Sequence, residues 1–121
     1  MTTEPVTQGH EMILPKKHVA YLAELDEKVG QHLFTVTQRT AEAIKKSGLK
    51  CEGINLFLAD WEAAFQEIFD LHMYVFPRYK GDSFRFDADW SQKPTRQELD
   101  EVAKAIKKSY NNILQTTNSG Y

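Results

Sequence analysis

Three protonatable side chains, Asp70, His72 and Tyr74, alternate with apolar residues in the stretch QEIFDLHMYVFPR, residues 66–78. Successive side chains of a β-strand point to opposite faces, so a strand here places these three on one face, roughly 6.5–7 Å apart. A row of carboxylate, imidazole and phenol groups can exchange protons and attack an electrophile. A single histidine between apolar neighbours is more often structural, so this row alone defines no reaction.

Two further apolar runs predict the strands that accompany this row. Residues 11–15 form a short apolar run that closes at Pro15, which suits the end of a strand. Residues 53–59, GINLFLA, are a second apolar run, and residues 60–64 are expected to form a tight connection. The sequence therefore predicts three strands, with the polar row on the last of them.

Two amphipathic segments predict helices. Over residues 26–46 apolar side chains recur at three- to five-residue steps, and Gly48 follows as a stop signal. A second helix is predicted to begin at the capping box TRQE, residues 95–98, in which two side chains satisfy backbone amides of the first turn. Residues 112–121 are expected to be a flexible tail.

The composition is that of one ordinary globular domain. The chain has 121 residues, of which 41% are hydrophobic and 26% charged, without an internal repeat or a low-complexity tract. We therefore predict a single domain over residues 1–121, large enough to bury a modest core.

The charge balance excludes several classes of protein. Fifteen Lys and Arg against seventeen Asp and Glu leave a net charge of −2, without the basic excess that a nucleic-acid surface needs. No apolar run approaches the ~20 residues of a membrane span, and the first residues do not resemble a signal peptide, so a cytoplasmic location is expected. Cys51 is the one cysteine and can form neither an internal disulfide nor a zinc-binding pair. No metal or cofactor is predicted.

Several separated motifs resemble the histidine triad (HIT) family of nucleotide hydrolases and transferases. They are PVTQGH (5–10), ILPKKH (13–18), GINL (53–56), EAAFQE (62–67), VFPRYKGD (75–82) and the closing helix from Pro94 to about Lys108. The resemblance implies an α+β fold, in which one long helix and a C-terminal helix pack on an antiparallel sheet. It also implies a twofold homodimer and a purine nucleotide or related small molecule as ligand.

The family signature is three histidines that alternate with apolar residues on one strand, and only the middle one is present here. In the family this histidine attacks the α-phosphorus of a nucleoside phosphate or phosphoramidate, and the matching residue is His72. The outer histidines are replaced by Asp70 and Tyr74. Tyr74 can still donate a hydrogen bond, whereas the Asp70 carboxylate supplies only acceptors and its charge would repel a phosphate.

Other matching positions bear on the binding of the phosphate. His18 matches a further histidine that many members hold near the active strand, and Gln66 and Glu67 match the polar pair before it, whose backbone amides can face a phosphate. Trp61 and Phe65 stand where the family often has glycines, so their side chains are expected to narrow or fill the cleft. Trp61 alternatively stacks on a base or packs at a dimer surface. Ala59 replaces an amide side chain that contacts the phosphates or the leaving group.

The family normally has about three dozen residues before the PVTQGH motif, and these contribute two strands and much of the base and ribose pocket. The sequence begins just before that motif, so these strands are expected to be missing, and Thr2 lies near the position of the ribose-binding acidic residue.

Three hypotheses follow from these residues. The first is a HIT-like nucleotide-binding protein with residual hydrolysis or nucleotidyl transfer through His72. The second is a non-catalytic binding or scaffold protein with a degenerate site. The third is a redesigned active site in which Asp70 acts as general base and Trp61 stacks on an aromatic substrate.

Overall fold

The structure, a computed structural model, describes residues 5–119 and the side chains of residues 5–116. Thr2 lies outside the described residues. The chain divides into two compact units, residues 1–85 and 86–121, where the sequence predicts one domain. The second unit contains one helix, and all its side chains from residue 86 to 116 are exposed, so it buries no core of its own.

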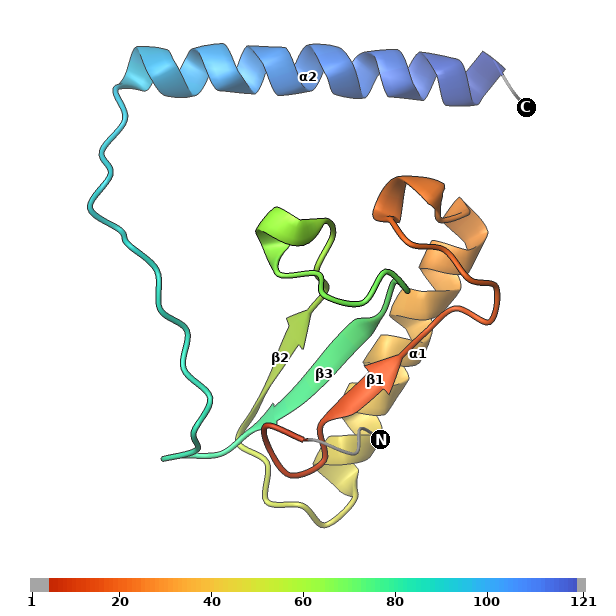
Figure 1. Cartoon of the computed structure of the whole chain (residues 1–121), viewed down its shortest axis with the longest axis vertical. Coiled ribbons are helices and arrows are strands. Elements are labelled where there is room, and N and C mark those ends of the chain that lie inside the picture. Colours follow the sequence, from red (N-terminus) through yellow and green to blue (C-terminus); the bar gives the residue numbers. More distant parts are fainter. Residues whose placement is uncertain (1–4, 120–121) are drawn as a thin grey trace. The chain divides into compact units, whose positions relative to one another are not determined.

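The first unit is a small α+β structure built on a three-stranded antiparallel sheet (Figure 1). Its strands are β1 (Glu11–Ile13), β2 (Gly53–Phe57) and β3 (Met73–Arg78). The strand order is β1-β3-β2, with Met12 opposite Tyr74 and Asn55 opposite Phe76. The predicted α+β class and antiparallel sheet are therefore confirmed, and the strand after His72 is the central one.

Helix α1 (Glu27–Lys46) lies along the sheet and contacts β1 and β3 (Figure 1). It begins at Asp26, whose carboxylate accepts hydrogen bonds from the amides of Lys28 and Val29. Its buried side chains are Leu33, Thr37 and Ile44. The helix predicted over residues 26–46 is confirmed, because its cap and its apolar spacing agree.

The strand predicted over residues 66–78 is shorter in the structure. Only Met73–Arg78 form β3, and residues 66–72 form an irregular segment with bends at residues 68–70. The expected row of side chains on one strand is therefore wrong at Asp70 and His72, both of which precede β3. The apolar residues in this segment alternate as they would in a strand, but no neighbouring strand pairs with it, since β1 pairs only as far as Met73 and β2 as far as Tyr74.

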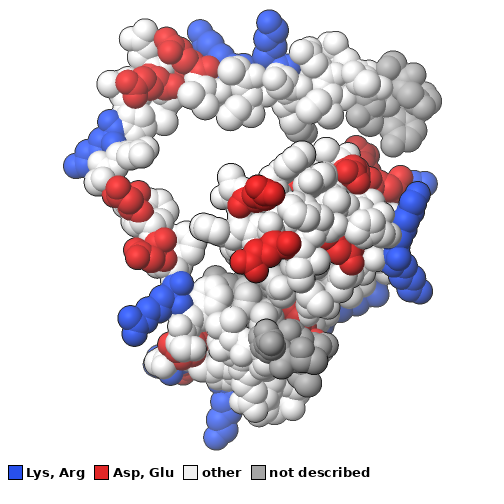
Figure 2. Space-filling view, viewed as in Figure 1, with Lys and Arg blue, Asp and Glu red and all other residues white. Residues whose placement is uncertain are grey.

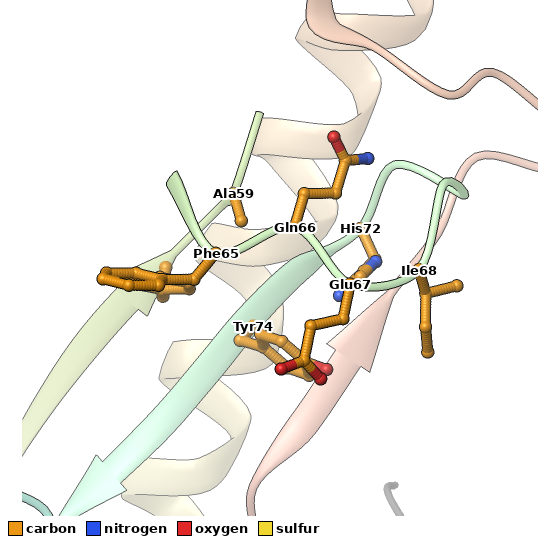
Figure 3. Close-up of a pocket in the computed structure, with 8 residues that line it drawn as sticks. Ala59, Phe65, Gln66, Glu67, Ile68, His72 and Tyr74 are labelled. Carbon is orange, nitrogen blue, oxygen red and sulfur yellow. The ribbon is translucent and has the colours of Figure 1, made fainter. Parts of the chain in front are cut away.

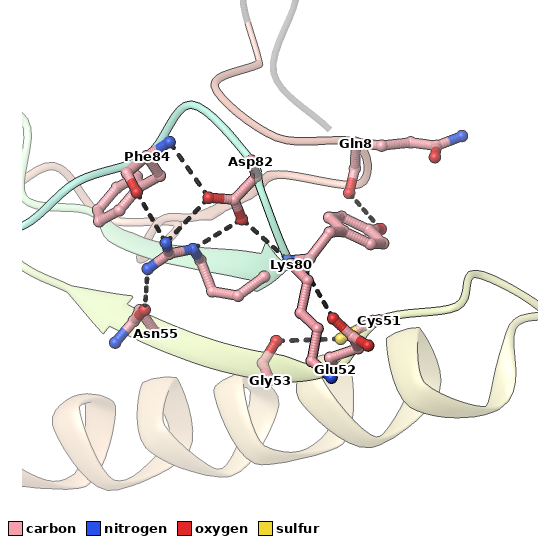
Figure 4. A network of polar contacts seen from close by, with 10 residues as sticks. Gln8, Cys51, Glu52, Gly53, Asn55, Lys80, Asp82 and Phe84 are labelled. Atoms are coloured by element: carbon pink, nitrogen blue, oxygen red, sulfur yellow. Dashed lines mark hydrogen bonds and ion pairs between the residues drawn. The ribbon is translucent and has the colours of Figure 1, made fainter.

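Arg78 at the end of β3 holds the following turn (Figure 4). Its guanidinium donates to both carboxylate oxygens of Asp82 at 2.9 Å, to Asn55 at 2.7 Å and to the Phe84 carbonyl at 2.8 Å. The Arg78 guanidinium holds the pKa of the Asp82 carboxyl well below its usual range, and the Tyr79 amide, which donates to Asp82 at 2.9 Å, lowers it further. The network fixes the exit of the central strand.

The second unit contains α2 (Arg96–Ser119). The predicted capping box is confirmed, because the Glu98 amide donates to the Thr95 hydroxyl at 3.1 Å and the Thr95 amide donates to the Glu98 carboxylate at 3.2 Å. The helix includes residues 112–119, where the sequence predicts a flexible tail. The apolar spacing continues at Ile113, so this stretch extends the helix.

Candidate functional site

A pocket of about 270 Å³ lies where the segment after β2 folds back beside the start of β3 (Figure 3). Four of the predicted site residues, Gln66, Glu67, His72 and Tyr74, line it together. The rest of the lining is Phe57, Ala59, Phe65 and Ile68. The structure thus brings the predicted nucleophile and the polar pair into one cavity.

His72 is the residue in this pocket with nucleophilic potential. Its side chain is largely buried, and its Nδ1 lies 2.6 Å from the Asp70 carbonyl oxygen. A carbonyl oxygen can only accept, so Nδ1 carries the proton and donates it. In the neutral ring the lone pair is then on Nε2, the nitrogen that remains available for attack.

Tyr74 in β3 packs against His72, which precedes the strand, and the two ring centroids lie 4.6 Å apart in an edge-to-face arrangement. On its other side is His10, whose ring centroid lies 4.8 Å from that of Tyr74. His10 is buried and its Nδ1 accepts the Val6 amide at 3.3 Å, while burial lowers its pKa. A neutral His10 therefore supports the Tyr74 ring, and the phenol is the one hydroxyl among the lining side chains.

Asp70 and His18 contact each other beside the pocket, and neither lines it. The Asp70 carboxylate lies 3.1 Å from His18 Nδ1, and both side chains are partly exposed. Asp70 thus serves His72 through its backbone carbonyl and serves His18 through its carboxylate. This pairing places the negative charge of Asp70 against an imidazole that can become positive.

Gln66 holds the loop that forms one wall of the pocket. Its buried side chain accepts the Trp61 amide at 2.7 Å and donates to the Ala20 carbonyl at 2.7 Å. Its own amide donates to the Trp61 carbonyl at 3.2 Å. Gln66 is therefore a structural tie, which leaves Glu67 as the member of the predicted polar pair whose amide has no such partner among the described residues.

Trp61 and Phe65 adopt backbone conformations that favour glycine. Trp61 has φ 73° and ψ 163°, and Phe65 has φ 69° and ψ 26°. The Trp61 indole stacks on the Tyr21 ring, with the ring centroids 3.9 Å apart and an interplanar angle of 7°. Phe65 lines the pocket with an exposed ring, whereas Trp61, predicted to lie in the same cleft, is absent from the lining.

Glu67 is the only lining residue with a full formal charge.

Among the described residues, no group of three His, Cys, Asp or Glu side chains is placed to hold a metal ion. On the face shown in Figure 2, Lys and Arg project singly or in small groups and do not form a continuous basic surface. Among the residues that the structure describes, no helix is long and apolar enough to cross a bilayer.

The residue pattern did not predict that Phe57 and Ile68 line the pocket, or that Tyr21 stacks on Trp61. Alternation of side chains along a strand gives no information on a loop that folds back across it. Trp61 and Phe65, which stand where the family often has glycines, could have indicated this loop, because glycine positions mark places where the chain turns sharply.

The antiparallel sheet, the helix along it and the pocket histidine at the start of the central strand define an α+β domain of the histidine triad type. The profile of the HIT domain matches residues 1–81. The chain belongs to this family.

The relatives and solved structures that resemble this chain are of the same kind. An uncharacterized HIT-like protein of Borreliella burgdorferi is 35% identical over 83 residues, which are 68% of this chain and 60% of that protein. The chain thus spans less than two thirds of that relative's length. A HIT family structure from Bacillus subtilis is 30% identical, with a TM-score of 0.73 over 85% of this chain and 74% of that one. A hypothetical histidine triad nucleotide-binding protein from Sulfolobus tokodaii is 27% identical, with a TM-score of 0.63 over 93% of this chain and 76% of that one.

Proposed function

We propose that this protein binds a purine nucleoside phosphate or phosphoramidate and cleaves it slowly at the α-phosphorus through His72. The observation that carries the proposal is the 2.6 Å hydrogen bond from His72 Nδ1 to the Asp70 carbonyl, which leaves Nε2 as the free nucleophile in a pocket. Family membership and the nucleotide-binding relative from Sulfolobus tokodaii support the ligand class. The proposal includes the twofold homodimer that the resemblance implies.

The reaction proceeds in two displacements. The Nε2 lone pair forms a bond to phosphorus while the bond to the leaving group breaks, and the leaving group departs with the electron pair and takes up a proton from solvent. The Nδ1 proton remains on the ring, and the Asp70 carbonyl stabilises the positive charge that develops there. An oxygen of water then forms a bond to phosphorus while the bond between phosphorus and His72 Nε2 breaks. The electron pair returns to Nε2, and the proton lost by water goes to solvent.

Two further groups have roles in this proposal. The Tyr74 hydroxyl donates to a phosphoryl oxygen, and the Glu67 amide supplies a second donor. The Asp70 carboxylate contacts His18 Nδ1 at 3.1 Å and lies outside the pocket lining. Ala59 and Phe65 provide no polar contact in the pocket, so the proposed turnover is slow.

Release of free amine from an adenosine 5′-phosphoramidate tests the proposal. We expect release by the parent and none by His72→Ala, with a nucleotidyl adduct trapped by acid-free quenching in the parent only. His32→Ala is the matched control, because His32 is exposed on α1, and this variant should retain full activity. Equal release by the parent and by a folded His72→Ala variant would exclude the proposal.

A non-catalytic binding protein is the second candidate function. It is favoured by the Phe65 ring and the Glu67 carboxylate in the pocket, which together weaken its fit to an anionic substrate. Binding of adenosine 5′-phosphate without release or adduct would select this candidate. The third hypothesis, with Asp70 as general base, is disfavoured because the carboxylate contacts His18 and does not line the pocket.

A further inference from the structure

Three apolar side chains, Phe57, Phe65 and Ile68, form one part of the pocket that contains His72, and we call them the apolar wall. They are 39%, 80% and 62% exposed. We propose that the apolar wall binds an uncharged aromatic group attached to the phosphoryl group of the ligand. This inference rests on the proposed function and names the ligand class within it.

The charges of the pocket select against a second anionic group. Its lining contains no lysine or arginine, and its one fully charged side chain is the carboxylate of Glu67. A ligand that continues from the first phosphate into a second or third phosphate brings additional negative charge beside Glu67. An uncharged aryl group avoids this repulsion and gains contact with apolar carbon.

The size of the pocket agrees with one ring. Its volume is about 270 Å³, whereas an apolar cavity of about 150 Å³ already binds benzene. The space therefore accommodates a single aromatic ring beside a phosphoryl group, and is small for a chain of phosphates that ends in a second nucleoside.

The backbone of Phe65 points to a role for its side chain outside the folded core. Phe65 lies in the left-handed region, where glycine is favoured, yet its ring is 80% exposed. Exposed carbon contributes little to folding, so burial does not explain why a bulky ring is kept there. Backbone strain of this kind is concentrated at binding sites, and this ring lines the pocket of His72.

Calorimetric titration with four ligands tests the proposal. Three carry one phosphodiester charge: the phenyl ester of adenosine 5′-phosphate, its methyl ester, and methyl phenyl phosphate. Adenosine 5′-diphosphate adds a charged substituent instead. We expect the parent to bind the phenyl ester about tenfold more tightly than the methyl ester, and the diphosphate more weakly than the phenyl ester.

Phe65→Ala locates the ring that the wall contacts. If the phenyl substituent lies there, this variant loses about tenfold for the phenyl ester and for methyl phenyl phosphate, and less than about twofold for the methyl ester. If the adenine ring lies there, it weakens both adenosine esters equally and leaves methyl phenyl phosphate unchanged. The first pattern supports the proposal. The second would overturn it, because the wall would then hold the base and not the group attached to the phosphoryl group.

The controls separate the wall from the fold and from the chemistry. Phe34→Ala removes an exposed ring of α1 and should change no affinity. Ile68→Ala leaves the Phe65 backbone intact and should lower the same affinities as Phe65→Ala, but by a smaller factor. It replaces Phe65→Ala in the test if that variant does not fold. Unchanged affinities in both wall variants, or tighter binding of the diphosphate than of the phenyl ester, would overturn the inference. In that case amine release that depends on His72 would still support the proposed function. Conversely, a parent protein that releases no amine but prefers the phenyl ester would still support the ligand class proposed here.

Discussion

Phe65 and Trp61 show how single residues shape this site. Both are large L-amino acids at positive φ, where a Cβ atom is crowded by the backbone. Trp61 offsets part of this cost, because its indole stacks on Tyr21. The exposed Phe65 ring offers little such compensation within the chain.

Glycine at position 65 should therefore stabilise the protein. Phe65→Gly relieves the left-handed backbone strain but increases the entropy of the unfolded chain. We expect the net effect to raise the free energy of unfolding by about 0.5–1 kcal/mol, measured by urea denaturation. Phe65→Ala keeps a Cβ atom and should show no such gain. An equal gain in both variants would show that removal of the ring, and not relief of the backbone, is responsible.

The site residues were predictable from the sequence to different degrees. His72 and Tyr74 were predicted to lie side by side, and the structure shows their rings in contact. Asp70 was placed in the same row, but its carboxylate contacts His18 instead. That contact joins residues 52 positions apart, so no local pattern could reveal it.

At the scale of elements, the turn after β3 depends on the ion pair between Arg78 and Asp82. The native state holds the pKa of Asp82 well below the ~3.9 of a free aspartate. The unfolded chain therefore binds a proton at a higher pH than the folded one does, so ionised Asp82 stabilises the fold fully above about pH 5. That contribution is lost as the pH falls below 4 towards the lower pKa of the folded state.

Asp82→Asn should reproduce this loss at neutral pH. We expect the variant to melt at a lower temperature than the parent at pH 7, and the difference to shrink as the pH is lowered towards 3. Asp87→Asn, at an exposed position in the following segment, is the matched control and should follow the parent. A melting difference that stays constant from pH 7 to 3 would contradict a role for the carboxylate charge.

Elements whose signals are local were predicted well, and those whose ends depend on pairing were not. The Asp26 cap and the Thr95–Glu98 box set the starts of both helices through contacts within four residues. The start of β3 depends on where its two neighbours end. Because apolar and polar residues alternate from Phe69 to Val75, the strand predicted from the sequence was too long.

At the scale of the whole molecule, the proposed site belongs to one of the two units. Every residue that lines the pocket lies between positions 57 and 74, and the HIT domain match ends at residue 81. The supporting contacts from Ala20 and His10 also come from the first unit. The unit of residues 1–85 therefore contains all the groups to which we assign a role.

A chain that ends after Arg85 should accordingly bind the phenyl ester of adenosine 5′-phosphate within about threefold of the full chain, a difference below about 1 kcal/mol. Titration of both chains measures this, and a cooperative thermal transition of the shorter chain shows that it is folded. Phe65→Ala in the shorter chain should lower affinity by the same factor as in the full chain. A folded short chain that has lost binding would contradict this assignment.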